Sequence, residues 1–114
     1  MTAQEVIQNC INSKSLSNIV IVMVILAYWI LGRITAAECA AFALQLGYTF
    51  DTSLHTMTTG ETTYTILQLL TAACDDVYSE KASLGKFVTR TVLKAAKNES
   101  YITTAEYDTL VASL

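Results

Sequence analysis

The chain has 114 residues, of which 53% are hydrophobic and only 15% are charged, and its formal net charge is −3. This composition excludes a largely disordered chain, which would need few apolar residues and many charges. The acidic balance disfavours nucleic acid as a partner, because proteins that bind nucleic acid usually carry a basic field. A chain of this length can bury one core, so we expect residues 1–114 to form a single helical domain.

The uncharged stretch at residues 15–32 dominates the sequence. Its centre, Ile19–Leu31, is apolar on every face of a helix and is about twice as long as an ordinary strand, which favours a helix. Such a helix is either the core of a bundle or a membrane span, and a span needs roughly 20 residues. Because residues 15–32 only just reach that length, we expect a core helix, and a membrane span is the less favoured alternative.

Helix start signals occur at four other places in the chain. In each, a threonine precedes a glutamate by three residues, which is the spacing of a capping box. In a capping box the threonine hydroxyl accepts from the glutamate N–H, and the glutamate carboxylate accepts from the threonine N–H. The four boxes are Thr2–Glu5, Thr35–Glu38, Thr58–Glu61 and Thr103–Glu106. A further helix is expected from about Ser83, where apolar residues recur at helical spacing.

The turn residues indicate the fold class. The chain has no proline and only four glycines, fewer turn residues than all-β folds usually require. We therefore expect an all-α fold, a bundle of five or six helices around Ile19–Leu31. Residues 48–60 are rich in threonine and are expected to be irregular. The stretch 55–65 is also compatible with a small β-hairpin, because threonine favours strands.

Two segments share one pattern, Ile34–Glu38 and Ile102–Glu106, and each follows an apolar helix and a tight turn. This unit resembles the XkdX-type segment of small proteins from tailed-phage tail gene clusters, whose pattern is Gly-x-Ile-Thr-x-x-Glu-Tyr. It also resembles the bacterial SHOCT module, which is associated with oligomerisation. The first copy has Cys39 where the phage pattern has tyrosine, and the second has Ser100 where it has glycine. The resemblance implies a phage or bacterial assembly protein and transfers no active site, and helix capping alone would require much of the same pattern.

The sequence contains no recognisable catalytic or metal-binding spacing. The one histidine, His55, and the three scattered cysteines lack the local spacing of a zinc site. The cysteines lie in apolar helical patterns, which are typical of buried, unreactive thiols. Asp75 and Asp76 are adjacent, so on a helix they point about 100° apart and cannot act on one substrate as an acid–base pair. We expect a protein that is not an enzyme, with no cofactor, no metal and no small-molecule substrate.

The strongest local feature is a stripe of cations on the helix that follows Ser83. The stripe is either a solvated helix face, a docking surface for an acidic partner or, least favoured, a contact with a nucleic-acid backbone. Tyrosines near the helix ends suit protein interfaces, because tyrosine combines apolar area with a polar tip. The candidate interface residues are Lys86, Arg90, Lys94, Lys97, Tyr101, Tyr107, Leu110 and Leu114.

These observations predict a structural or adaptor subunit of a larger assembly, in a bacteriophage particle, that acts with protein partners or with copies of itself. One alternative is a small membrane protein such as a holin, with residues 15–32 as its span. The other is a phage inhibitor that binds a host defence protein. Without a signal peptide at its start, and with an odd number of cysteines, the chain is expected in the cytoplasm or in the particle.

Overall fold

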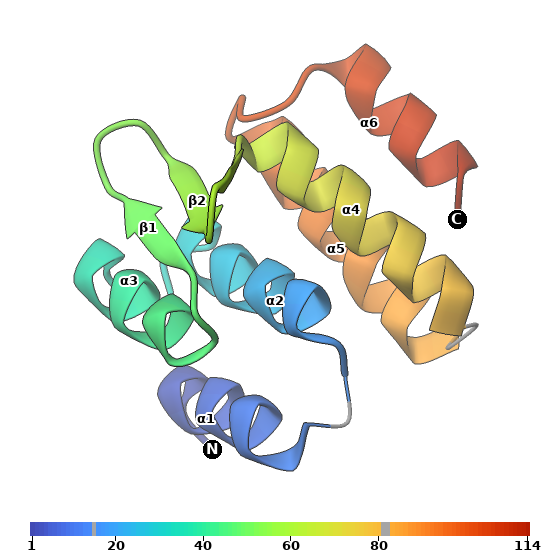
Figure 1. Ribbon diagram of the computed structural model, residues 1–114. Coiled ribbons are helices and arrows are strands. Elements are labelled where there is room, and N and C mark those ends of the chain that lie inside the picture. Colours follow the sequence, from blue (N-terminus) through green and yellow to red (C-terminus); the bar gives the residue numbers. More distant parts are fainter. Residues whose placement is uncertain (15, 81–82) are drawn as a thin grey trace.

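Figure 1 shows the computed structural model of the chain, in which a central helix, α2, is surrounded by α1, α3, α4 and α5. The structure describes residues 1–14, 16–80 and 83–114, and it describes side chains outside residues 76–88. Within these residues the helices are α1 (Ala3–Ser13), α2 (Asn18–Ile30), α3 (Ala36–Gln45), α4 (Ile66–Glu80), α5 (Ser83–Asn98) and α6 (Thr104–Ala112).

Helix α2 is buried because it offers no polar face to water. Its neighbours α1, α3, α4 and α5 all pack against it. The buried side chains of α2 are Val20, Ile21, Val22, Met23, Ile25, Leu26, Ala27 and Ile30. The expected core helix at Ile19–Leu31 is therefore confirmed. Among the residues that the structure describes, no helix combines the length and the apolar character of a membrane span.

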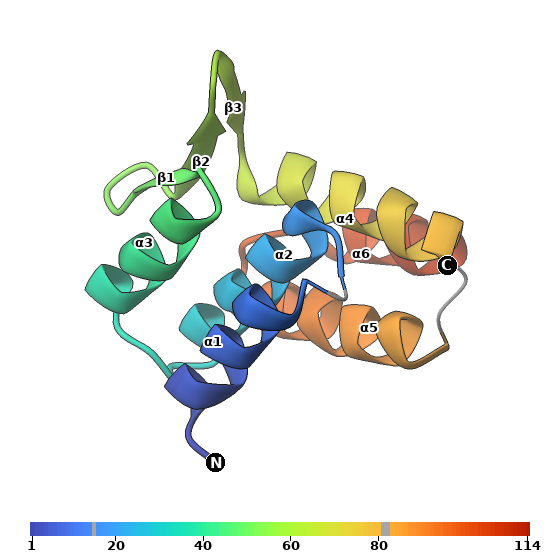
Figure 2. The same cartoon turned by 60° about the horizontal axis from the view of Figure 1, so that its bottom comes forward.

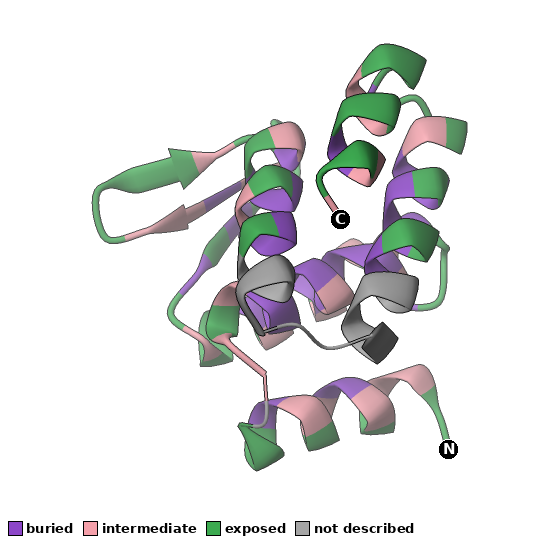
Figure 3. Ribbon diagram, turned by 90° about the vertical axis from the view of Figure 1, so that its right-hand side faces the viewer, coloured by how far each residue is buried: buried purple, intermediate pink, exposed green. Residues whose placement is uncertain are grey.

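The expectation of an all-α fold is wrong, because the chain between α3 and α4 forms an antiparallel sheet in the order β1-β2-β3. Its strands are β1 (Thr49–Asp51), β2 (Thr56–Thr59) and β3 (Thr62–Tyr64). The β2–β3 pair is the hairpin considered for residues 55–65. Gly60, at a φ of 58°, opens its two-residue turn, and one glycine is all that such a turn requires. This hairpin projects from the helices and is exposed around its turn, from Gly60 to Thr63 (Figures 2 and 3).

Strand β1 lies in the stretch that was expected to be irregular. Phe50 of β1 stands opposite Met57 of β2, and both side chains are buried against the core. The connecting loop is ordered by Asp51, whose Oδ1 accepts 2.8 Å hydrogen bonds from the N–H groups of Ser53 and Leu54. The sheet therefore forms because two apolar side chains, distant from any helix pattern, meet on one face of paired strands.

Three of the four predicted capping boxes are confirmed, at Thr2, Thr35 and Thr103. The box predicted at Thr58 is wrong, since Thr58 lies in β2 and its hydroxyl is 3.0 Å from that of Thr63 in β3. Helix α4 is capped instead by Thr65, whose hydroxyl accepts from the Gln68 N–H at 3.2 Å. The Gln68 side chain accepts from the Thr65 N–H at 2.9 Å, which completes a box of the threonine–glutamine type.

The repeated sequence pattern is also a repeated structure. The helix before each Ile-Thr pair ends with a left-handed residue, Gly32 at a φ of 73° and Ser100 at a φ of 65°. In both copies the N–H of the following residue donates a hydrogen bond to the carbonyl five residues before it. These bonds run from Arg33 to Tyr28 at 2.8 Å and from Tyr101 to Ala96 at 2.9 Å. This is the Schellman arrangement that closes many helices.

After each Schellman turn the chain buries an isoleucine and starts a capped helix. Ile34 and Ile102 are buried, and Thr35 and Thr103 are the N-caps of α3 and α6. Each helix packs on the one before it, α3 on α2 and α6 on α5. The chain therefore contains two three-helix units, α1–α2–α3 and α4–α5–α6, which the sheet connects.

Candidate docking groove

In the first unit, α1 closes one edge of α3 through polar side chains. The Gln4 amide Nε2 donates a 2.9 Å hydrogen bond to Oε2 of Glu38. One turn further along α1, the amides of Gln8 and Gln45 pair reciprocally at 3.0 Å. Glu38 and Gln45 lie seven residues apart, so they share one side of α3, and α1 runs along that side.

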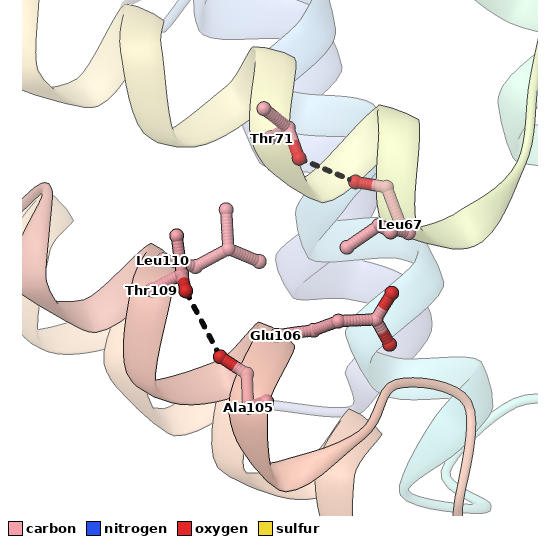
Figure 4. A pocket seen from close by; sticks show the side chains of 6 residues that line it. All are labelled: Leu67, Thr71, Ala105, Glu106, Thr109 and Leu110. Carbon is pink, nitrogen blue, oxygen red and sulfur yellow. Dashed lines mark hydrogen bonds between the residues drawn. The ribbon is translucent and has the colours of Figure 1, made fainter.

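In the second unit, the equivalent edge of α6 carries Glu106 and borders an open groove. The groove lies between α4 and α6 and has a volume of about 350 Å³ (Figure 4). Its lining residues are Leu67, Thr71, Ala105, Glu106, Thr109 and Leu110. The second unit thus leaves uncovered the helix edge that α1 covers in the first.

The residues of α4 explain why this edge stays open. When α4 and α1 are aligned on their caps, Thr65 on Thr2, Leu67 takes the place of Gln4 and Thr71 takes the place of Gln8. Leu67 has no amide to donate to Glu106. The Thr71 hydroxyl donates a 2.8 Å hydrogen bond to the Leu67 carbonyl of its own helix. Neither side chain therefore provides the bridge that its counterpart on α1 makes to α3.

The lining of the groove is apolar in spite of its threonines. The Thr109 hydroxyl donates to the Ala105 carbonyl at 3.0 Å, just as the Thr71 hydroxyl donates within α4. Both hydroxyls are satisfied by their own helices (Figure 4). The threonines therefore need no further partner, and their methyl groups together with Leu67 and Leu110 favour an apolar ligand.

Among the six residues that line the groove, Glu106 is the charged one. Its Oε1 accepts the Thr103 N–H at 2.7 Å, which is the reach-back bond of the capping box. Figure 4 shows its carboxylate on the Leu67 side of the groove. A carboxylate can accept several hydrogen bonds, and Glu38 accepts from both the Thr35 N–H and the Gln4 amide. Glu106 therefore has the capacity to accept a second donor from outside the chain.

A second hollow, of about 270 Å³, adjoins the groove. Leu67 lines both cavities. The second hollow also includes Leu54, whose side chain is 73% exposed at the rim, and the rings of His55 and Tyr101.

An aromatic cluster supports this second hollow. The Trp29 ring lies 5.2 Å from Phe50, 5.1 Å from His55 and 5.4 Å from Tyr101, measured between ring centroids. His55 also meets Tyr101 edge to face at 5.6 Å. These rings join α2, the β1–β2 loop and the turn before α6, so they fix the position of the hollow relative to the core.

The predicted cation stripe is divided in the structure. Arg90 and Lys94 are exposed on α5, whereas the Lys97 ammonium lies 4.4 Å from the centroid of the Tyr107 ring, a cation–π contact between α5 and α6. Lys86 lies outside the residues whose side chains the structure describes. Lys97 and Tyr107 thus help to hold α6 on α5.

The other predicted interface residues lie in or near the core. Tyr101 belongs to the aromatic cluster, Leu114 is half-buried against the core, and Leu110 is buried at the base of the groove. Sequence reasoning missed the rest of the groove lining. One signal was available, because the cap alignment of α4 on α1 replaces two glutamines by Leu67 and Thr71.

Two of the three cysteines, Cys39 and Cys74, are buried. Burial raises the pKa of the Cys39 thiol to about 12, and burial followed by the nearby Asp75 carboxylate raises the pKa of Cys74 to about 11. Both thiols therefore stay protonated at neutral pH. Within the described part of the chain, no three histidine, cysteine, aspartate or glutamate side chains gather to hold a metal ion.

Comparison of the chain with family models, with curated proteins and with solved structures finds no significant match.

Proposed function

We propose that the protein is a non-enzymatic structural or adaptor subunit of a larger assembly, and that the groove between α4 and α6 docks a helix of a neighbouring subunit. The observation that carries this proposal is the open edge of α6. In the first unit the same edge of α3 is covered by a helix, α1, which bonds to Glu38. The fold thus contains its own example of the kind of element that covers this edge.

The chemistry of the groove supports a helical ligand. Apolar side chains on one stripe of an amphipathic helix would fill the space beside Leu67 and Leu110, as in other helix-in-groove interfaces. A donor side chain at the edge of that stripe would bond to Glu106. Burial of apolar area supplies about 25 cal/mol per Å², and the Glu106 contact orients the ligand.

The phage assignment rests on the two Ile-Thr-x-x-Glu turns and their resemblance to the XkdX-type segment. Both turns fold as capped helix starts after a Schellman closure. Small proteins of phage tail gene clusters act within multi-subunit particles, which is the setting that an open docking groove suits.

The experiment is a size measurement in the cell that makes the protein. The tagged chain should sediment in a clarified lysate far above its own mass of 12.4 kDa. Thr109→Arg should shift it toward that mass, because the arginine fills the groove from an exposed position. Thr62→Arg, the same change at an exposed threonine of β3, is the matched control and should leave the profile unchanged. Sedimentation of the native chain at 12.4 kDa under these conditions contradicts the proposal.

A further inference from the structure

The outward faces of the described helices differ in character. The outward face of α1 carries Glu5 and Asn9, and that of α5 carries Arg90 and Lys94. Helix α3 is different, because its outward face consists of exposed, uncharged residues at helical spacing. We call this face the α3 ridge, and its residues are Ala37, Ala41 and Leu44.

We propose that the groove between α4 and α6 binds the α3 ridge of a second copy of this chain. The inference rests on the proposed function and names the neighbouring subunit. Leu44 is 65% exposed, one of the most exposed large apolar side chains in the described residues. Its burial in an apolar groove is a favourable transfer that the isolated chain cannot make.

The shapes of the two surfaces match. The ridge runs from Ala37 to Leu44 along α3, a separation of seven residues and about 10 Å of helix. Ala37 and Ala41 are small, and they would face Ala105, Thr71 and Thr109, which are small or short as well. Short side chains on both surfaces let helices approach closely, at the 8–10 Å axis separation of packed helices. Leu44 supplies the one large side chain, and it would fill the apolar part of the groove.

The charges of the two surfaces also match when the N-terminal end of the α3 ridge lies at the Glu106 end of the groove. Arg33 is exposed two residues before Thr35, the N-cap of α3, and Glu106 lies at the groove edge in the first turn of α6. Arg33 would donate to Glu106 of the second copy, as the Gln4 amide donates to Glu38 within the first unit. A guanidinium–carboxylate contact at the rim would set the direction of the ridge in the groove.

The ridge and the groove are different surfaces, so the contact is heterologous. Each copy gives its ridge to one neighbour and its groove to another, which produces a ring or an open fibre according to the rotation between copies. A symmetric dimer through one self-complementary patch is not the arrangement that this contact makes.

The test measures the mass of the purified full-length chain by sedimentation over a range of concentrations. The native chain should form species larger than 12.4 kDa that grow with concentration. Leu44→Glu removes the ridge and Thr109→Arg blocks the groove, so each variant alone should be a monomer. Both positions are exposed, and circular dichroism with thermal melting will verify that both variants fold.

An equimolar mixture of the two variants makes the test specific. The Thr109→Arg chain keeps its ridge and the Leu44→Glu chain keeps its groove, so the mixture should give a species of two chains that grows no further. Thr62→Arg should associate like the native chain. Monomeric native protein, association that survives either variant, or a mixture that stays monomeric would each overturn the inference. Should the purified chain be a monomer while the lysate profile stays large, the proposed function stands and the neighbour is a different protein.

Discussion

The side chain of Gln4 donates a 2.9 Å hydrogen bond to the carboxylate of Glu38, and this contact joins α1 to α3 across the surface of the first unit. Two hydrogen bonds lower the pKa of Glu38 below its usual value of 4.5. The bond from the Thr35 N–H has the larger effect, and the bond from the Gln4 amide has the smaller. At the equivalent place in the second unit, Leu67 makes no such contact with Glu106, and both residues line the groove.

The substitution Gln4→Leu should raise the pKa of Glu38 toward 4.5 without restoring it fully, since the Thr35 N–H remains. A carboxyl with a lowered pKa in the folded state stabilises the fold above its unfolded pKa, and that contribution is lost as the pH falls through the folded value. The loss of stability on acidification should therefore be smaller in Gln4→Leu. NMR titration of Glu38 and melting curves at pH 7 and pH 3 measure both effects, and an unchanged Glu38 titration would contradict the account.

The capping threonines should act on stability and not on docking. Thr35→Ala and Thr103→Ala each remove a hydroxyl that accepts a 3.1 Å bond from the N–H of the third helical residue. Each should lower the free energy of unfolding by about 1 kcal/mol. Denaturant unfolding gives the cost, and sedimentation below the unfolding transition should show association like that of the native chain. A stable Thr35→Ala chain that no longer associates would mean that the turn itself is part of the interface.

Ser100 occupies a left-handed position that its counterpart, Gly32, fills without a side chain. A non-glycine residue pays conformational energy there, so Ser100→Gly should stabilise the chain by about 1 kcal/mol. The reverse change, Gly32→Ser, should destabilise it by a similar amount, although no atom lies within 4 Å of the added Cβ. Thermal unfolding of both variants measures the two effects, and a Ser100→Gly chain no more stable than the native chain would contradict the account of backbone strain.

The cysteines should differ in reactivity. Cys39 and Cys74 are buried and have raised pKa values of about 12 and 11, whereas Cys10 is half-buried. A thiol reagent at pH 8 should modify Cys10 in the folded chain, and the other two only on unfolding. Because the folded pKa values are raised, these two thiols stabilise the fold below pH 9, and that contribution declines as the pH rises from 9 toward 12. Rapid modification of all three thiols in the folded chain would disprove their burial.

Local signals in the sequence predicted the elements that depend on local physics. The boxes at Thr2, Thr35 and Thr103 are set by contacts within four residues, and Ile19–Leu31 is apolar on every face, so both follow from the sequence alone. Strand β1 depends on a partner, because Phe50 becomes a strand residue only by pairing with Met57. Thr58 satisfies the spacing of a capping box, and only its cross-strand contact with Thr63 reveals the strand.

The groove exists because α4 and α6 are separated, and the spacing of apolar residues along the sequence does not predict the distance between two helices. The repeat predicts that α6 resembles α3, and that similarity extends to Ile102 and Glu106. Whether α4 closes on α6 depends on the side chains at two positions, Leu67 and Thr71, and on the packing of α4 against α2. Leu110 was predicted as an interface residue from its place near the C-terminus, and the structure places it at the base of the groove.

The central claim is that one copy inserts its α3 ridge into the groove of another, and a directed disulfide tests it. One protein carries Ala41→Cys on the ridge and the other carries Thr109→Cys in the groove, both with Cys10→Ser to remove the accessible native thiol. Docking holds the two new thiols together and raises their effective concentration. Mild oxidation of the mixture should therefore give a two-chain product much faster than either protein alone. Equal rates when Thr62→Cys, at an exposed position of β3, replaces Ala41→Cys, or no mixed product at all, would contradict the claim.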